Sequence, residues 1–257
     1  MRELTEMERS PGQGNYASAG AGFAPTAPPV QNQPTSPRGP AWMPAIPPLP
    51  NCPPGLEYLS QVDQLLIHQQ TELLEIVTPF ETNNKYEIKN SLGQRIYFAA
   101  EQSGFLMRQW GSSRSFTLRF FDNIGQEVMA VERPFNLLFS SLFQELEVQA
   151  PPGKPIGYVI QKSYNYAPEF AIQNEERIDI LKLVGPCITC SCFEDTRFEV
   201  LNLDGSSLGC ISKQWSGFAR EVFTDADNFG IQFPLELEVK MKAVLLGACF
   251  LIVSPSL

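Results

Sequence analysis

After residue 55, apolar and polar residues alternate in short paired runs that predict β-hairpins. Each pair has an alternating run, a turn cluster with Asn, Asp, Gly or Pro, and a second alternating run, as in two antiparallel strands joined by a tight turn. Residues 64–78 add one or two further strands. The five pairs recur every 25–31 residues and cover residues 85–100, 116–131, 145–161, 170–184 and 197–213. We therefore expect a mainly β fold, a closed antiparallel barrel or a sandwich.

The last part of the chain breaks this alternation and predicts a helix that is apolar on every side. It contains an 11-residue apolar run, AVLLGACFLIV, at residues 243–253. A helix without a polar face is enclosed by protein or lies in lipid, and a helix that spans a bilayer needs about 20 apolar residues. We expect a helix over residues 238–253 inside the barrel, and Leu245 and Phe250 are candidate membrane contacts if the helix meets lipid instead.

The first 54 residues differ in composition and predict a disordered, Pro-rich tail, so the globular domain is expected at residues 55–257. The tail holds 13 of the 22 prolines and few aliphatic residues. Such a segment cannot bury enough apolar surface to offset its ordering entropy. Spaced prolines are candidate SH3 or WW ligands in a polyproline II conformation, although chance spacing in a segment so rich in proline is the simpler explanation. These prolines are Pro25, Pro28, Pro44, Pro47 and Pro50.

Net charge and cysteine content narrow the classes of function. The net charge of −9 argues against broad binding to nucleic acid through overall charge, and the N-terminus lacks the apolar run of a secretory signal. Residues 187–192 form a CxxCxC pattern, in which zinc would need a fourth ligand such as Cys210. Small buried thiols explain the same pattern more simply. The sequence offers no Cys–His pair that would indicate covalent catalysis, and we expect no enzyme activity.

Long stretches of the globular part resemble the phospholipid scramblases. They lie at residues 53–75, 84–101, 144–161, 185–193 and 223–252, and they include QAPPGKPIGYVIQ and FTDADNFGIQFPLELEVKMKAVLLGACFLI. The resemblance implies a Tubby-like barrel of about twelve strands around a hydrophobic C-terminal helix. It also implies calcium-dependent, ATP-independent movement of phospholipids in both directions between leaflets, at the cytoplasmic face of the plasma membrane.

The segment TDADNFGIQFPLE, residues 224–236, has part of the pattern of a calcium loop. Counted as an EF-hand, it places Asp225, Asp227 and Glu236 at positions 1, 3 and 12, and the carbonyl of Ile231 at position 7. Phenylalanines at positions 5 and 9 remove two ligands, so we expect an affinity on the order of 10⁻⁴–10⁻³ M. A strand preceded by a turn with solvated aspartates explains the segment as well. The resemblance favours calcium, because this is the family's proposed site, although Glu236 stands where other members have Asp.

The chain departs from the family's pattern where relatives carry palmitoylated cysteines. The stretch before the QAPPG turn has no cysteine, so no palmitoylation is expected there and a cytosolic fraction becomes plausible. An apolar patch occupies it instead and is a candidate either for membrane contact or for ordinary burial in a hairpin. The patch consists of Phe135, Leu138, Phe139, Leu142 and Phe143.

These departures leave a second function open. Residues 209–218 resemble a segment proposed as a nuclear import signal, but Cys210 stands where that segment has a lysine. In the alternative, the protein is a cytosolic or nuclear interaction protein. The barrel is then a rigid scaffold, the Pro-rich tail recruits SH3 or WW partners, and calcium is incidental.

Overall fold

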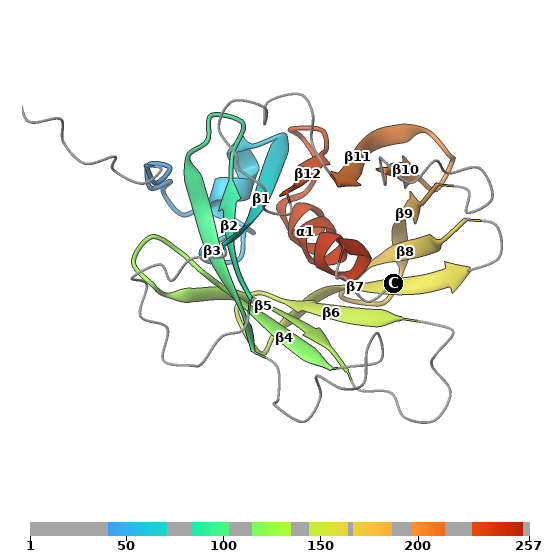
Figure 1. Cartoon of the computed structure of the whole chain (residues 1–257), viewed down its shortest axis with the longest axis horizontal. Helices are drawn as coiled ribbons and strands as arrows, with labels where there is room; N and C mark the ends of the chain where they lie inside the picture. Colours follow the sequence, from blue (N-terminus) through green and yellow to red (C-terminus); the bar gives the residue numbers. More distant parts are fainter. Residues whose placement is uncertain are drawn as a thin grey trace, which may run out of the picture. The chain divides into compact units, whose positions relative to one another are not determined.

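The fold is described from a computed structural model, which contains twelve strands and one α-helix in its described residues (Figure 1). The described residues are 41–70, 84–102, 115–134, 144–163, 167–186, 197–213 and 228–253. The strands are β1 (Gln64–Gln70), β2 (Lys85–Lys89), β3 (Arg95–Gln102), β4 (Phe116–Phe121), β5 (Glu127–Arg133), β6 (Glu145–Gln149), β7 (Pro155–Ser163), β8 (Glu169–Asn174), β9 (Asp179–Val184), β10 (Arg197–Asn202), β11 (Ser207–Lys213) and β12 (Asn228–Gln232). A short 3₁₀ helix, η1 (Glu57–Gln61), precedes β1, and α1 (Val239–Val253) follows β12.

The twelve strands form one closed antiparallel barrel in which each strand pairs with its neighbours in sequence. Pairing of β1 with β12 closes the barrel, with Leu65 opposite Ile231. All five predicted hairpins are confirmed, as β2–β3, β4–β5, β6–β7, β8–β9 and β10–β11. The predicted class, a closed barrel around a hydrophobic C-terminal helix, is confirmed with it.

Strand direction determines which connections lie together. Because consecutive strands alternate in direction, the five hairpins all turn at the same end of the barrel. The end of β12, the start of β1 and the start of α1 lie at this end too. We call it the short-turn end. The connections at the opposite end fall mostly outside the described residues.

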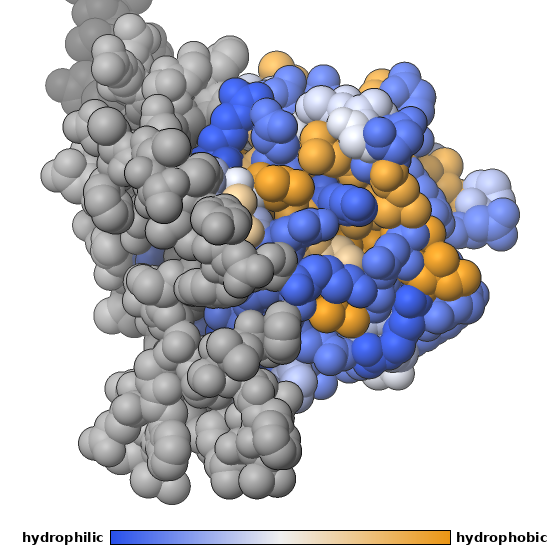
Figure 2. Space-filling view, turned by 90° about the vertical axis from the view of Figure 1, so that its right-hand side faces the viewer, coloured by the Kyte–Doolittle hydropathy of each residue, from blue (hydrophilic) through white to orange (hydrophobic). Residues whose placement is uncertain are grey.

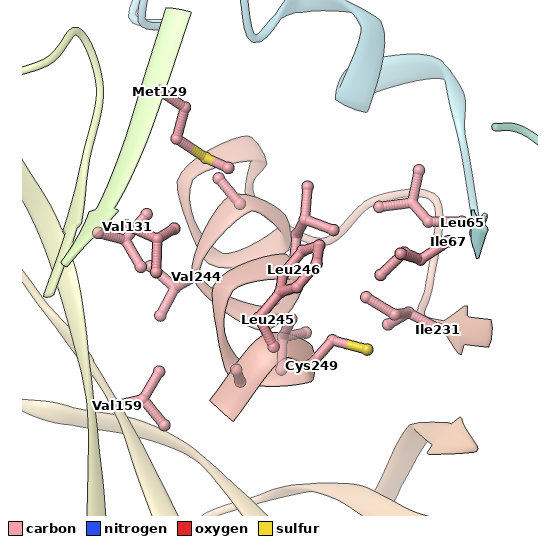
Figure 3. Close-up of a cluster of buried hydrophobic side chains, with 14 of the residues drawn as sticks. Leu65, Ile67, Met129, Val131, Val159, Ile231, Val244, Leu245, Leu246 and Cys249 are labelled. Carbon is pink, nitrogen blue, oxygen red and sulfur yellow. The ribbon is translucent and has the colours of Figure 1, made fainter. Parts of the chain in front are cut away.

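Helix α1 fills the barrel and forms the centre of its core (Figures 1 and 3). Figure 3 shows its side chains between β5 and β7 on one side and β1 and β12 on the other. Leu245 is fully buried and Phe250 is 9% exposed, packed edge-on against the rings of Tyr86 and Phe120. These two candidates for membrane contact therefore lie in the core, and they reach lipid only if α1 leaves the barrel.

Two glycines allow α1 to lie close to the barrel wall. A Cβ atom on Gly247 of α1 would come within 2.8 Å of a methyl carbon of Val148 in β6. A Cβ atom on Gly157 of β7 would come within 2.6 Å of a methyl carbon of Val244 in α1. Both distances are shorter than real contacts of a Cβ atom, so a larger side chain at either position would push the helix from the wall.

The segment before η1 packs against the barrel from residue 41 onward. The compact unit spans Gly39–Leu257, so it includes residues that the composition assigned to the tail. Trp42 forms a parallel bridge with Arg95, and the Arg95 guanidinium lies 5.0 Å from the centre of the Trp42 ring. The apolar side chain of Met43 packs against the core. A tryptophan and a few aliphatic residues among the prolines thus supply apolar surface that residue counts alone do not reveal.

Candidate functional site

The segment considered for calcium forms β12 and the turn that follows it. Ile231 lies in β12 between two paired strands, opposite Leu65 of β1 and Ile211 of β11, and its side chain is fully buried. Glu236 lies in the exposed turn between β12 and α1. Asp225 and Asp227 lie outside the described residues.

The described part of this segment does not have the fold of an EF-hand loop. Positions 4–8 of such a loop correspond to β12, which is extended over about 13 Å, whereas an EF-hand loop wraps around its ion. Because β12 is paired on both sides, the Ile231 carbonyl points toward a neighbouring strand. Glu236 follows the C-terminal end of β12, in the turn before α1. Residues 228–232 are therefore held as a paired strand and not as the curved part of an EF-hand loop. Among the described residues, no group of three or more His, Cys, Asp or Glu side chains has an arrangement that could hold a metal.

A buried lysine lies where α1 enters the barrel. The Lys242 side chain is fully buried, and its ammonium donates hydrogen bonds to the backbone carbonyls of Leu59, Val62 and Leu235 at 2.7–2.9 Å. The ammonium also lies 5.1 Å from the centre of the Phe233 ring. One side chain thus joins α1 to η1, to the residue after η1 and to the turn after β12.

The surroundings of Lys242 disfavour its charge. Burial lowers the pKa of the Lys242 ammonium to about 8, while the carboxylates of Asp63 and Glu236 act in the opposite direction. Three carbonyl acceptors match the three donors of an ammonium group. We therefore assign Lys242 to anchoring α1, a role that the sequence analysis missed. The available signal was a lysine that lies inside the apolar part of the helix, one position before the apolar run at residues 243–253, whereas Lys240 lies in the first turn.

A hollow lies at the short-turn end, where Lys240 of α1 contributes to its lining, with a volume of about 580 Å³. Its lining includes Cys52, Pro151, Lys154, Glu175 and Lys240. The Lys240 ammonium donates to the Glu175 carboxylate at 2.6 Å, which lowers the pKa of Glu175 and raises that of Lys240. This pairing offsets one of the two lysine charges in the hollow, which leaves its lining weakly charged.

A second buried group of charged side chains, centred on Glu87, contacts the segment before η1 through Arg95. The Glu87 carboxylate is 3% exposed and accepts hydrogen bonds from the Arg95 guanidinium and from Gln70, while Lys89 lies 2.7 Å away. Arg95 in turn contacts Trp42 through its guanidinium. The buried carboxylate is therefore surrounded by two cations, and one of them links it to the N-terminal segment.

Comparison with known proteins identifies the family. The profile of the Scramblase family matches residues 43–254. The chain belongs to the scramblase family. Phospholipid scramblase 1 of Mus musculus is 61% identical over 237 residues, which cover 90% of this chain and 72% of the mouse protein. Phospholipid scramblase 1 of Homo sapiens is 59% identical over 257 residues, or 94% of this chain and 79% of the human protein.

A more distant member is similar over nearly its whole length. Phospholipid scramblase family member 5 of Homo sapiens is 53% identical over 244 residues, which cover 90% of each chain. No solved structure matches this scramblase-family chain. The resemblance noted from the sequence is thereby confirmed at the level of the family.

The remaining candidate residues of this scramblase-family chain are placed only in part. The CxxCxC cysteines, the apolar patch at residues 135–143, Pro25 and Pro28 lie outside the described residues. Cys210 is buried in β11, and Pro44, Pro47 and Pro50 are exposed. In the part of the chain that the structure describes, no helix combines the length and apolarity needed to cross a bilayer.

Proposed function

We propose that this scramblase-family protein moves phospholipids between the two leaflets of a membrane. The match to the family over residues 43–254 carries the proposal, and relatives of 59–61% identity named phospholipid scramblase 1 support it. Equilibration of lipids between leaflets is downhill and changes no covalent bond. The movement is therefore bidirectional and independent of ATP. It requires no nucleophile and no acid–base pair. By its resemblance to the family, we place the protein at the cytoplasmic face of the plasma membrane.

In this proposal, lipids move along the outer surface of the protein, since α1 fills the barrel. Its side chains at Val244, Leu245 and Leu246 are fully buried against the inner faces of the strands (Figure 3). Burying one such side chain is worth about 1.5–3 kcal/mol, so removing the whole helix from its core would exceed a typical domain stability of about 5–15 kcal/mol. The helix therefore stays in place while the protein acts.

Calcium activation is a further part of the proposal. It rests on the carboxylates of Asp225 and Asp227, whose spacing is that of two calcium ligands, and on the resemblance to the family. Ile231 and Glu236 contribute only in an arrangement other than an EF-hand loop, because β12 lies between Asp227 and Glu236. The expected affinity is weak, on the order of 10⁻⁴–10⁻³ M.

A second candidate function is recruitment of SH3 or WW domains by the Pro-rich segment. The observation that favours it is the exposure of Pro44, Pro47 and Pro50 beside the barrel. Exposed prolines at this spacing present the surface that such domains bind. In this reading the barrel is a scaffold in the cytosol or nucleus. Loss of binding of an SH3 or WW domain array after Pro44→Ala/Pro47→Ala/Pro50→Ala would support it, and no binding by the wild type would refute it.

Reconstitution tests the main proposal. The full chain is placed in liposomes that carry a fluorescent phospholipid, and accessibility to an external quencher is followed during a calcium titration. We expect quenching to exceed the half that belongs to the outer leaflet, with activation by calcium in the millimolar range. Asp225→Ala/Asp227→Ala should abolish activation, and Glu199→Ala, which changes an exposed carboxylate on β10, should not. Quenching no greater than in empty liposomes would refute lipid movement, and equal activation in all variants would refute the calcium site.

A further inference from the structure

The large apolar side chains that are exposed in the described residues gather at one end of the barrel. Their exposed fractions range from 36% to 80%, and they are Leu49, Leu92, Ile124, Ile178, Leu203 and Leu235. Four of them lie in the turns of hairpins β2–β3, β4–β5, β8–β9 and β10–β11, and Leu235 lies in the turn from β12 to α1. The antiparallel order brings these turns to the short-turn end. We call these six residues the apolar rim.

The position of Leu49 and of the remaining hairpin completes the rim. The Leu49 carbonyl accepts a hydrogen bond from the backbone N–H of Cys52. Cys52 lines the same hollow as Pro151 of the β6–β7 turn. Pro151 and Pro152 are both exposed in that turn. Each of the five hairpin turns therefore presents an exposed apolar or proline side chain at the short-turn end.

In three of these turns, the backbone donor of the apolar residue is already bonded within the turn. An Asn or Asp that opens the turn accepts two backbone N–H groups on one side-chain oxygen, at 2.8–3.1 Å. One of the two donors is the apolar residue itself. The acceptor and apolar donor pairs are Asn90 with Leu92, Asp122 with Ile124, and Asn174 with Ile178. When these apolar residues leave water, their backbone N–H groups keep a hydrogen bond within the turn. The free-energy cost of transferring them to a less polar phase is therefore lower.

We propose that the apolar rim docks the protein on the surface of a phospholipid bilayer, with the rim side chains inserted between headgroups. This inference rests on the proposed function in lipid movement. The buried core of a protein–protein interface is a closely packed patch that is more apolar than the surrounding surface, whereas the rim side chains lie on separate turns. Separate insertions of about 5–10 Å suit the interfacial layer of a bilayer. Figure 2 shows one face of the molecule, on which hydrophobic residues are interspersed among hydrophilic ones.

Charge on the rim selects the kind of membrane. The turns carry more carboxylates than cations. The carboxylates are Asp122, Glu175, Glu176, Asp204, Glu236 and Glu238, against the cations Lys154 and Arg177. Of these, Glu175 is paired with Lys240 at the start of α1, and Arg177 is paired with Glu145 of β6. A negative rim is repelled by anionic lipids. The rim therefore binds a zwitterionic surface such as phosphatidylcholine best, and on anionic vesicles its binding should strengthen when salt screens the repulsion. At physiological ionic strength the Debye length is about 8 Å, so the repulsion from the anionic cytoplasmic leaflet is weakened and the apolar side chains can still dock there.

Vesicle flotation with the full chain tests the rim. We expect the wild type to float with phosphatidylcholine vesicles and to bind vesicles rich in phosphatidylserine more weakly at low salt. Leu92→Ser/Ile124→Ser/Leu203→Ser should weaken binding by about 5-fold for each residue, or about 100-fold in total, because insertion removes part of each side chain from water. Replacing the same three residues with Trp, which favours the interfacial layer, should tighten binding. All three residues are more than half exposed, so circular dichroism and thermal unfolding should show folded proteins.

The outcomes separate the rim from the proposed function. Vesicle binding that is absent in the wild type, or equal in the wild type and the Ser variant, would overturn the rim as a membrane surface. A dimer seen by analytical ultracentrifugation that the Ser variant loses, with vesicle binding unchanged, would assign the rim to self-association and overturn it too. Binding through the rim without lipid movement in the reconstituted assay would leave the rim in place and refute the proposed function. Lipid movement by the wild type, together with flotation that is equal in the wild type and the Ser variant, would refute the rim and leave the proposed function in place.

Discussion

Replacing Lys242 with Met tests the anchor that joins α1 to the short-turn end. Methionine has a similar length but donates no hydrogen bond, so the carbonyls of Leu59, Val62 and Leu235 would each lose a donor. Hydrogen bonds from a charged donor contribute about 1.5–3 kcal/mol each, which gives roughly 5–9 kcal/mol for the three.

Two effects reduce this loss. Lowering the pKa of Lys242 from 10.5 to about 8 means that the buried charge costs about 3 kcal/mol at neutral pH, and the substitution removes that cost. Leu235 is 49% exposed, so water can replace the donor at its carbonyl. We therefore expect Lys242→Met to lower the free energy of unfolding by about 3 kcal/mol, with a drop of about 6–12 °C in Tm for a domain of this size.

Denaturant titration and differential scanning calorimetry measure both quantities, and Lys240→Met is the matched control. Lys240 lies two residues earlier on the same helix and pairs with Glu175 at the surface. Such pairs contribute at most about 1 kcal/mol, so the control should stay close to the wild type. Equal stability of Lys242→Met and Lys240→Met would refute the assignment of Lys242 as an anchor.

Three further predictions concern pH, packing and the buried carboxylate. Between pH 8 and 10.5, Lys242 keeps its proton in the unfolded chain but loses it in the folded one. The free energy of unfolding of the wild type should therefore rise by up to about 3 kcal/mol relative to that of Lys242→Met as pH rises through this range. Denaturant titrations that give the same pH dependence of this free energy for both proteins would contradict the prediction. Gly247→Leu should destabilise the barrel by about 3 kcal/mol, because a Cβ atom there would lie 2.8 Å from a methyl carbon of Val148 and the rest of the side chain would overlap the wall further. Gly247→Ala should destabilise it by less than about 1 kcal/mol, since the better helix propensity of alanine partly offsets the same Cβ contact. Similar Tm values for the two variants would show that α1 is not held against the wall. Glu87→Gln should lower the free energy of unfolding by about 3 kcal/mol, because it leaves two buried cations without their carboxylate. Glu145→Gln removes the carboxylate of an exposed ion pair and should lower it by less than about 1 kcal/mol. Equal urea midpoints for these two variants would refute the distinction.

The hairpins and the helix could be predicted because their signals are local. Alternation with a period of two, interrupted by Asn-, Asp- or Gly-containing turns, gives strand and turn positions without knowledge of the rest of the chain. The apolar run at residues 243–253 likewise predicts a helix. Its length and its lack of a polar face indicated enclosure, and the structure places α1 inside the barrel.

The anchor and the N-terminal contacts could not be predicted, because they depend on residues that are distant in sequence. The ammonium of Lys242 meets carbonyls 180 and 183 positions earlier in the chain. The contact of Trp42 with Arg95 similarly depends on the folded barrel, because Arg95 is the first residue of β3 and its position is set by strand pairing. At residues 224–236, two local patterns competed. The structure has a strand at Asn228–Gln232, as one of the two patterns predicted. The calcium prediction now rests on Asp225 and Asp227.

The central claim is that α1 stays inside the barrel while the protein moves lipids, and the reactivity of Cys249 tests it most directly. The Cys249 side chain is 1% exposed within the core, and burial raises the pKa of its thiol. The full chain in liposomes that are moving lipid is treated with a membrane-permeant maleimide, and mass spectrometry then locates the label, with denatured protein as the positive control. We predict that Cys249 remains unlabelled throughout lipid movement. Labelling of Cys249 that begins together with lipid movement would show that the helix leaves the barrel and would contradict the account.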